Sequence, residues 1–487
     1  SKVRICPECA VRPLDDVSFY RGTTMKKLFD LHYMATLCVA ALAVLMTSAI
    51  FAQNPATSLE DRNIQRYQQQ AERMAQGDVD LLWVGDSITH FWESHGKEVW
   101  DKFYAERKAM NFGISGDRTG HVLWRMEHSP MDKISPKLTV VMIGTNNIGH
   151  FIDGKAHSTP AETVEGIQAI VNKLKSLYPT TKILLLEVFS RGNKPDDPLR
   201  LSVNGINEGL RAIYANNKVE NVQLYSLNDL FLQKDGVLPP EIMPDFLHPN
   251  KAGYEIWANA IEPIVADALG DAPIDTVSGP VDADWWRDRF NEKNEILKKG
   301  NVDLLMIGDS ITHFWDDTPF FANNGHEVWQ KYYGDKNAVD LGHGGDQTQH
   351  VLWRLENYDF TNVSPKAAVL LIGVNNTWGN DRQPKNIALG QRRIVKKLRE
   401  LFPNMKIFVL KIFPCPRVQD QIDAINALTP YYMRDIDNVE VLDISKVFLN
   451  KDGELTEAVM PDLLHPNAVG YESWGAALYL KIEEAMK

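Results

Sequence analysis

A long internal repeat constrains this chain more than any other feature. The stretch "DLLWVGDSITHFW" at 80–92 returns almost unchanged as "DLLMIGDSITHFW" at 303–315. A repeat of this length represents a whole domain of roughly 200 residues rather than one unit of a short-period solenoid. The sequence therefore predicts two copies of one fold. Two further blocks return in the same order, namely 121–147 as 350–376 and 243–261 as 460–478.

The expected domain boundaries follow from where the repeats begin and end. We expect the first domain at 58–269 and the second at 285–487, joined by a linker at 270–284 that is rich in Pro, Gly, Ser and Asp. The chain has 487 residues, of which 44% are hydrophobic and 24% charged, as in soluble globular proteins. Its net charge of −12 argues against a nucleic-acid partner, because phosphate binding needs clustered Lys and Arg.

The amino-terminal region has the pattern of an export signal. Lys26 and Lys27 precede an apolar run that reaches Ala52, so we interpret residues 25–52 as a bacterial signal peptide. Residues 1–24 are interpreted as upstream sequence that is not translated. A retained membrane anchor is the alternative, because the run approaches the ~18 residues that a span requires. With cleavage, we expect a secreted or periplasmic protein without stable membrane insertion.

Cysteine usage predicts neither a metal site nor an intramolecular disulfide. Cys6 and Cys9 form an isolated C-x-x-C, and Cys38 lies in the apolar run. A zinc site of this kind needs a second pair of ligands, which is missing from the sequence. Only Cys415 would remain after processing, so the stability of the protein must come from its core.

Apolar segments alternate with helical patterns within each copy. The stretch 163–178, for example, has apolar residues at helical spacing. An order of strand, helix and strand predicts an α/β domain with a buried parallel sheet, and ligands bind such sheets at the carboxyl ends of the strands. In the first copy we expect strands at 80–85, 138–144, 182–189 and 222–225.

Residues with catalytic chemistry follow the expected strand ends. Ser87 comes directly after the first strand, and Asp245 with His248 can supply the carboxylate and the base that a serine nucleophile needs. The Gly116 amide and the Asn146 side chain are candidate donors for an oxyanion. Each residue also has a plain structural alternative as a helix cap, a surface turn or a loop residue. The set occurs in one order, twice in one chain, which favours catalysis over coincidence.

These blocks, G-D-S, G-x-x-G-D, G-x-N and D-x-x-H in this order, resemble the four blocks of the SGNH (GDSL-type) hydrolases. The segments "NFGISGDRTGHVLWRM", "RGNKPDDPLR" and "DFLHPNKAGY" are similar to the branch of platelet-activating-factor acetylhydrolase catalytic subunits. The resemblance covers about 60–265 and 285–487. It implies two tandem flavodoxin-like domains with three α/β/α layers, a serine esterase mechanism and no cofactor.

The resemblance also implies a role for each candidate residue. Ser87 is the nucleophile, His248 is the general base and then the acid, and Asp245 orients the imidazole. The Ser87 amide, the Gly116 amide and the Asn146 side chain form the oxyanion hole. In the second copy the same roles fall to Ser310, His465, Asp462, Gly345 and Asn375.

The two copies differ near these blocks. His343 and Gln347 stand where the first copy has Ile114 and Arg118, which puts equal substrate preference of the two sites in doubt. The second copy also has a longer loop after its serine block, and we expect this loop to make the second site more enclosed. The loop has eleven residues at 316–326, against five at 93–97.

Other residues near the serines are weaker candidates. His90 and His313 follow the two serines closely and are rival bases, although a residue three positions into a helix turns away from its start.

The aromatic residues of the first copy are expected to form core, and one of their rings is a candidate for the substrate pocket. They are Phe91, Trp92, Trp100 and Trp124.

Together, the sequence and the resemblance predict a carboxylic-ester hydrolase with two catalytic domains. We expect it to remove small acyl groups, mainly O-acetyl, from carbohydrates, because the chain has an export signal and no long apolar lid segment. A phospholipid, lysophospholipid or platelet-activating-factor-like acylhydrolase is the alternative that the family branch suggests. An alternative of another class makes one copy a non-catalytic glycan-binding module. The two domains are also candidates for an intramolecular pseudo-dimer.

Overall fold

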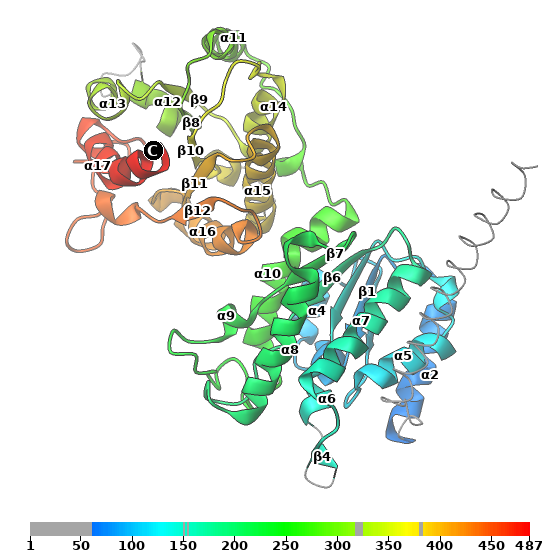
Figure 1. Ribbon diagram of the computed structural model, residues 1–487. Coiled ribbons are helices and arrows are strands. Elements are labelled where there is room, and N and C mark those ends of the chain that lie inside the picture. The colour runs from blue at the N-terminus through cyan, green and yellow to red at the C-terminus, as the bar shows by residue number, and fades with distance from the viewer. Residues whose placement is uncertain (1–60, 150, 153–154, 317–324, 379–382) are drawn as a thin grey trace, which may run out of the picture.

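Two α/β units make up the described part of the chain (Figure 1). The first unit runs from Asp61 to Leu269 and the second from Asp284 to Lys487. The expected signal peptide at 25–52, the segment 1–24 and most of the longer loop at 316–326 lie outside the described residues, so these expectations stay predictions. The computed structural model describes residues 61–149, 151–152, 155–316, 325–378 and 383–487.

The first unit is built on a five-stranded parallel sheet. Its strands are β1 (Leu81–Gly85), β2 (Ala109–Gly113), β3 (Leu138–Met142), β6 (Lys182–Leu186) and β7 (Val222–Tyr225). Their order in the sheet is β2-β1-β3-β6-β7, and all neighbouring pairs are parallel. The chain passes from β1 to one side and then crosses to the other, so a topological switch point lies beside β1. Ligands of α/β proteins bind at such points.

Helices cover both faces of this sheet. The helices of one face share a buried cluster with Leu82 and Val84 of β1, and those of the other face pack around Trp83. The first group is α2 (Asp61–Ala75), α5 (Thr119–His128), α7 (Pro160–Leu177) and α8 (Pro198–Tyr214), and the second is α4 (Lys97–Phe103) and α10 (Lys251–Leu269). Short elements complete the unit: α3 (Ser87–His90), η1 (Phe91–Glu93), η2 (Met131–Lys133), α6 (Thr145–Gly149), β4 (Phe151–Ile152), β5 (Lys155–Ala156), η3 (Ala215–Asn217) and α9 (Asn228–Phe231).

The second unit repeats this architecture, which confirms the prediction of two tandem α/β/α domains. Its strands are β8 (Leu304–Gly308), β9 (Ala338–Gly342), β10 (Ala367–Leu371), β11 (Lys406–Leu410) and β12 (Val439–Leu442), in the equivalent order β9-β8-β10-β11-β12. Its longer helices are α11 (Asp284–Lys299), α12 (Ser310–Asp316), α13 (His326–Tyr333), α14 (Thr348–Asn357), α15 (Pro384–Leu401), α16 (Gln419–Met433) and α17 (Ala468–Ala485). Its short helical turns are η5 (Val374–Trp378), η6 (Pro416–Val418) and η7 (Ser445–Phe448).

The sequence explains these elements and their ends. The central strands read as continuous apolar runs because helices cover both of their faces. The helix expected at 163–178 begins earlier, at Pro160, because Thr159 caps it: Thr159 Oγ1 accepts the Glu162 N–H, and the Glu162 carboxylate accepts the Thr159 N–H. Strand β3 ends at Met142 rather than Gly144, because Gly85 pairs with Met142 at the end of β1. Within the described residues, no helix has the length and apolar character for crossing a membrane.

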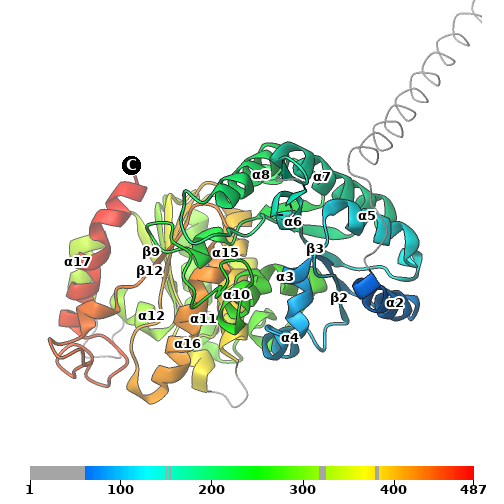
Figure 2. The same cartoon turned by 90° about the horizontal axis from the view of Figure 1, so that it is seen from below.

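The two units contact each other through different faces, as Figures 1 and 2 show. Helix α10 of the first unit packs against α16 of the second, and Ala266 of α10 is buried with Ala388, Leu389 and Tyr432. Around this apolar centre, Asp267 of α10 lies among cations of α15. Its carboxylate is 3.5 Å from Arg392 Nε, 3.4 Å from Arg393 Nε and 2.9 Å from Lys396 Nζ.

The connection between the units is itself packed against the second unit. Its short helical turn, η4 (Ile274–Thr276), contacts α14 and α15. Asp275 is 1% exposed, and its Oδ1 accepts a hydrogen bond of 2.7 Å from Asn376 Nδ2. Its carbonyl oxygen accepts one of 2.7 Å from Thr348 Oγ1. In the first unit, the equivalent Asn147 instead contacts Ser158 of the same unit, at 3.4 Å between Nδ2 and Oγ. The connection therefore supplies a buried contact to the second unit.

We predict that Asp275→Ala destabilises the second unit by roughly 1–3 kcal/mol, because Asn376 loses a buried hydrogen-bond partner. Amide hydrogen exchange followed by mass spectrometry should show faster exchange in α14 and α15, with the first unit unchanged. The matched control is Asp282→Ala, since the Asp282 side chain is 94% exposed in the same connection. Equal protection of α14 and α15 in both variants would show that the connection is a passive tether.

Candidate active site

The turn after β1 places Ser87 at the carboxyl edge of the first sheet. Ser87 begins α3, and Asp86 caps this helix by accepting the Ile88 N–H at 3.0 Å. The turn is tight because a Cβ on Gly85 would overlap Thr89 and lie 2.5 Å from the Met142 carbonyl oxygen. Only glycine lets the helix start this close to the neighbouring strand. The second unit repeats the arrangement with Gly308, Asp309 and Ser310.

Each serine lies beside a histidine and an aspartate from the far end of its unit. In the first unit, Ser87 Oγ is 2.9 Å from His248 Nε2, and His248 Nδ1 is 2.6 Å from Asp245 Oδ2. The second unit has the same two distances, 2.9 Å from Ser310 Oγ to His465 Nε2 and 2.6 Å from His465 Nδ1 to Asp462. A carboxylate accepts from Nδ1–H, which leaves Nε2 to accept the serine proton. This is the arrangement of a serine nucleophile with its base.

A compact turn holds the aspartate against the histidine. Asp245 Oδ1 accepts the N–H groups of Leu247 at 3.1 Å and of His248 at 2.7 Å, while Phe246 adopts a φ of 57°. Burial raises the pKa of Asp245, but the hydrogen bonds from the His248 backbone and side chain outweigh it, and the pKa lies below its usual value. Asp245 therefore stays ionised and holds the imidazole in one orientation.

The candidate oxyanion donors lie on the next two turns of the same sheet edge. Gly116 has a φ of 83°, a left-handed conformation that favours glycine. Asn146 is the second residue of α6, which follows β3, and its Nδ2 donates to the Asp117 carbonyl oxygen at 3.0 Å, which fixes the plane of the amide. In the second unit Gly345 has a φ of 73°, and Asn375 Nδ2 donates to the Asp346 carbonyl oxygen at 2.9 Å. The structure thus brings all the predicted site residues to one edge of each sheet.

A buried ion pair that the sequence analysis missed supports this turn. Arg125 of α5 is 0% exposed, and its Nε and Nη2 lie 2.9 and 2.6 Å from Asp117 Oδ2. In the second unit Arg354 binds Asp346 in the same way, at 2.8 and 2.7 Å. Each aspartate follows the candidate glycine donor directly. The signal was present in the sequence, because both residues of the pair recur in both copies of the repeat.

A family model described as the GDSL-like lipase/acylhydrolase family matches residues 83–256 and 306–472, one match in each unit. The chain belongs to this family. The α2 subunit of human platelet-activating factor acetylhydrolase IB is 35% identical over 195 residues, which are 40% of this chain and 79% of the relative. The bovine α1 subunit is 32% identical over 201 residues, which are 40% and 81%. A solved acylhydrolase structure from Bacteroides fragilis has 21% identity and a TM-score of 0.36, covering 44% of this chain and 100% of that one.

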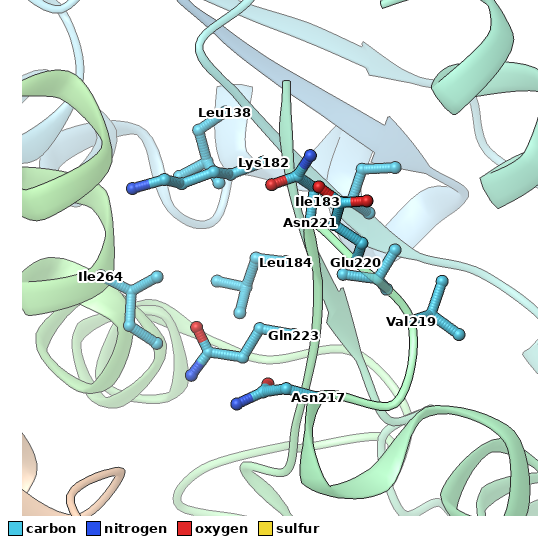
Figure 3. A pocket seen from close by; sticks show the side chains of 11 residues that line it. Leu138, Lys182, Ile183, Leu184, Asn217, Val219, Glu220, Asn221, Gln223 and Ile264 are labelled. Carbon is cyan, nitrogen blue, oxygen red and sulfur yellow. The ribbon is translucent and has the colours of Figure 1, made fainter. Parts of the chain in front are cut away.

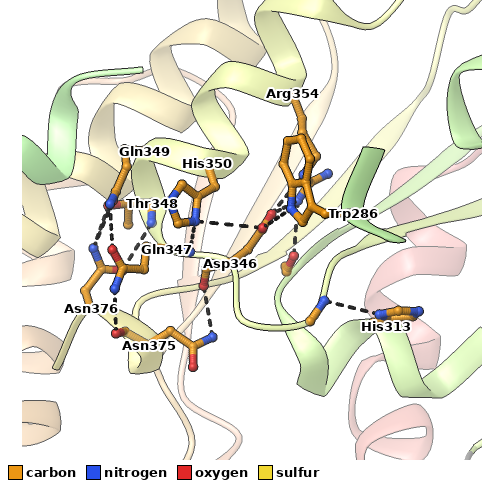
Figure 4. Close-up of polar contacts among 12 residues, drawn as sticks. Trp286, His313, Asp346, Gln347, Thr348, Gln349, His350, Arg354, Asn375 and Asn376 are labelled. Carbon is orange, nitrogen blue, oxygen red and sulfur yellow. Dashed lines mark hydrogen bonds and ion pairs between the residues drawn. The ribbon is translucent and has the colours of Figure 1, made fainter. Parts of the chain in front are cut away.

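The candidate site of the second unit contains a polar cluster with its own partners (Figure 4). Trp286 Nε1 donates to Asp346 at 2.7 Å, and Gln347 Nε2 donates to the Asn375 carbonyl oxygen at 3.0 Å. His343, expected near the pocket, is instead 0% exposed and packs against the Trp286 ring. Burial lowers its pKa well below the usual value, so the ring is neutral. Of the two substitutions seen in the sequence, Gln347 contacts the candidate site and His343 belongs to the core.

His90 and His313, the rival candidates for the base, contact groups other than the two serines. His90 Nδ1 lies 3.0 Å from Ser115 Oγ, and His313 Nδ1 accepts the Gly344 N–H at 3.2 Å. Burial lowers the pKa of His90 to about 4 and that of His313 to about 3, so both rings are neutral near pH 7. They support the turns that contain Gly116 and Gly345.

Among the expected aromatic residues, one ring lies at the site. Phe91 packs against the candidate catalytic imidazole, with 5.0 Å between the ring centroids of Phe91 and His248. Trp92 is fully buried in the core, and Trp124 stacks on His128 at 4.2 Å, on the helix that follows the glycine turn. The second unit repeats the first contact, with 5.0 Å between Phe314 and His465.

A cavity of about 290 Å³ in the first unit lies away from the serine (Figure 3). It is lined by Leu138 and Lys182, which begin β3 and β6, and by Ile264 of α10. These residues mark the amino ends of the strands, opposite to the edge that carries Ser87. Among the described residues, no group of three or more His, Cys, Asp or Glu side chains is arranged to hold a metal ion, and Cys415 is buried with a free thiol.

Asp86 and Asp309 are buried aspartates that cap the helices beginning at Ser87 and Ser310. Burial raises the pKa of Asp86 from 3.8 to about 7. The folded state therefore binds a proton that the unfolded state releases, so this contribution to stability is complete below pH 4 and is lost as the pH rises through 7. Asp86→Asn keeps the cap but removes the titration. Urea unfolding from pH 4 to 8 should show the wild type losing stability relative to the variant, by on the order of 4 kcal/mol. A pH-independent difference would contradict a neutral Asp86.

The second prediction concerns the candidate oxyanion donor of the first site. In a Ser310→Ala chain, where only the first site can act, Asn146→Ala should lower kcat on an aryl acetate by about 10²–10³. KM should change little, because the negative charge develops only in the transition state. Asn146→Asp has the same shape but places an acceptor there, so it should be at least as damaging. A loss confined to KM in both variants would show that Asn146 only shapes the pocket.

Proposed function

We propose that this protein is a serine carboxylic-ester hydrolase with two catalytic sites that removes small acyl groups, mainly acetyl. The observation that carries the proposal is the repeated geometry: each unit has a serine hydroxyl 2.9 Å from an imidazole that an aspartate orients at 2.6 Å. A copy without activity would not require the same 2.9 Å between serine Oγ and histidine Nε2, which lie 161 positions apart in the first unit and 155 in the second. This favours catalysis in both units over a glycan-binding role for one of them.

In the proposed reaction, His248 Nε2 accepts the proton of Ser87 Oγ as the oxygen attacks the ester carbonyl carbon. The amides of Ser87 and Gly116 and the Asn146 side chain stabilise the negative carbonyl oxygen. The C–O bond to the alcohol then breaks, the alcohol takes the proton from the imidazolium, and the acyl group stays on Ser87. A water molecule, deprotonated by the same imidazole, releases the acid and restores the serine.

Two considerations support a small acyl group. Relatives that are 35% identical are named platelet-activating factor acetylhydrolases, so acetyl is the acyl group in their names. In addition, Phe91 and Phe314 lie against the catalytic imidazoles, at 5.0 Å between ring centroids, and take up space on that side of each serine. We infer that acetyl is the preferred acyl group at both sites.

Carbohydrate is the proposed alcohol component of the ester. The support is the export signal predicted at 25–52, which would bring the enzyme to a secreted or periplasmic location where acetylated glycans are accessible. The alternative, a phospholipid or platelet-activating-factor-like ester, is favoured by the names of the relatives.

Contacts between α10 and α16 support a role for the two units as an intramolecular pseudo-dimer.

We predict that Ser87→Ala and Ser310→Ala each leave partial activity on an aryl acetate, and that the double variant has essentially none. Loss of a nucleophile costs orders of magnitude at its own site, whereas the other site retains its complete set. Released acetate is measured for three substrates: an aryl acetate, acetylated oligosaccharides and a phospholipid with an acetyl group.

The controls separate the alternatives. Ser94→Ala changes an exposed serine near the first site and should leave activity at the wild-type level. If one single serine variant is already inactive on the aryl acetate, the unit that keeps its serine is a binding copy. If acetate is released from the phospholipid with a higher kcat/KM than from every acetylated oligosaccharide, the lipid alternative replaces the carbohydrate proposal.

A further inference from the structure

Two tryptophans of the second unit are unusually exposed. The chain has 12 tryptophans, all within the described residues, and most are buried or half-buried. Trp285 and Trp378 are the exceptions, with 51% and 46% of their surface exposed. A large aromatic ring that stays in water gains none of the stabilisation of burial, and exposed aromatic rings around a site can serve as contacts for a ligand. Their positions around the candidate site support that interpretation.

Trp378 lies beside the catalytic turn of the second site. It ends η5, three residues after the candidate oxyanion donor Asn375. The Arg417 guanidinium lies over its ring, with 5.5 Å from Cζ to the ring centroid. The same guanidinium donates from Nη2 to the Asp462 carbonyl oxygen at 2.9 Å. Asp462 orients His465, so a single arginine connects the exposed ring to the catalytic turn.

Trp285 lies beside the other donor of the same site. It is the second residue of α11, and its Cη2 atom would be 3.8 Å from a Cβ on Gly344. Gly344 directly precedes Gly345, the candidate backbone donor. The next residue, Trp286, is buried and donates from Nε1 to Asp346 at 2.7 Å. The buried ring therefore anchors the start of α11, and the exposed ring stays at the rim of the glycine turn.

The first unit has no counterpart of these rings. In the repeat alignment, Trp378 corresponds to Gly149 and Trp285 to Arg62. At Gly149 a Cβ would lie 2.3 Å from Arg191 Nη1, so a side chain there would require the guanidinium to shift. Arg191 is held there by hydrogen bonds to the Thr145 carbonyl oxygen and hydroxyl at 3.1 and 3.0 Å. The aromatic rim is therefore specific to the second site and is not required by the shared fold.

We propose that Trp285 and Trp378 form a stacking subsite for sugar rings of the ester's alcohol component at the second site. This inference rests on the proposed ester hydrolysis and names the substrate class for that site. One face of a pyranose presents C–H groups that pack flat on an indole, while its hydroxyls keep their hydrogen bonds at the rim. A quaternary ammonium group also binds indole rings. At Trp378, however, the guanidinium of Arg417 already lies over the ring, and a second cation nearby would be repelled.

The experiment uses the full chain with Ser87→Ala, so that only the Ser310 site acts. Acetate release is measured on ethyl acetate, on acetylcholine and on acetylated xylose, mannose and glucose oligosaccharides. Trp378→Ala and Trp285→Ala should each lower kcat/KM on the best oligosaccharide about tenfold more than on ethyl acetate, mainly through KM. Trp378→Phe should recover most of the loss. Leu480→Ala, at a residue of α17 that is 77% exposed, controls for removal of exposed apolar surface.

The other outcomes overturn the inference and are distinguishable. Equal losses on ethyl acetate and on the best oligosaccharide would show that the rings only support the catalytic turn. A larger loss on acetylcholine than on every oligosaccharide would assign the rings to a cationic alcohol. A change in molecular mass by light scattering in the tryptophan variants, without a selective kinetic loss, would assign them to a contact between chains. If the Ser87→Ala chain cleaves none of these esters, the proposed function of the second site fails, independently of the tryptophans.

Discussion

The hydrogen bond between the serine hydroxyl and the histidine Nε2 is the contact on which the rest of each unit depends. In the first unit it joins residues 161 positions apart, and its length of 2.9 Å tolerates little displacement of either end. The serine is placed by the turn after the central strand β1, and the histidine by a turn before α10. Helix α10 packs against the same sheet around Trp83 and Trp257, at 5.4 Å between ring centroids. The aromatic core between α10 and the sheet therefore sets the distance between nucleophile and base.

Both units keep this contact, although some of their buried polar residues differ. Gln70 and Asn111 of the first unit correspond to Lys293 and Asp340 of the second, and all four are buried. A buried charge without an opposite charge nearby costs several kcal/mol, and Asp340 has such a charge in Arg289, whose Nη2 lies 3.6 Å from Asp340 Oδ2. The buried Arg–Asp pair behind each glycine turn, in contrast, is unchanged. Divergence has affected the support around the turns and the rim of the site, and the candidate catalytic residues are the same in both.

The contact between the units is asymmetric, because α10 of the first unit packs against α15 and α16 of the second. In α10, Ala266 is buried against the second unit, and Ile264 lines a pocket together with residues of that unit. The equivalent positions of α17 are Lys481 and Glu483. A contact between unlike faces can in principle add further copies without end. Charged residues on α17 disfavour that, because docking against an apolar centre would remove Lys481, Glu483 and their ion-pair partners Glu440 and Lys336 from water, which is costly.

The sequence alone determined the duplication, the α/β class and the order of catalytic blocks, because each depends on local patterns. Continuous apolar strands, a capped amphipathic helix and polar residues at strand ends are visible without any knowledge of distant contacts. The sequence also contained the buried ion pair in both copies, as Asp117 with Arg125 and as Asp346 with Arg354. Residues eight positions apart, however, have no helical or strand spacing that would reveal a contact. Only the tertiary structure decided that His343 lies in the core while Gln347 reaches the site. It also decided that the connection at Asp275 is part of the second unit and that two of the twelve tryptophans face solvent beside a candidate site. These properties depend on which side chains from distant segments come together, and packing in three dimensions decides that.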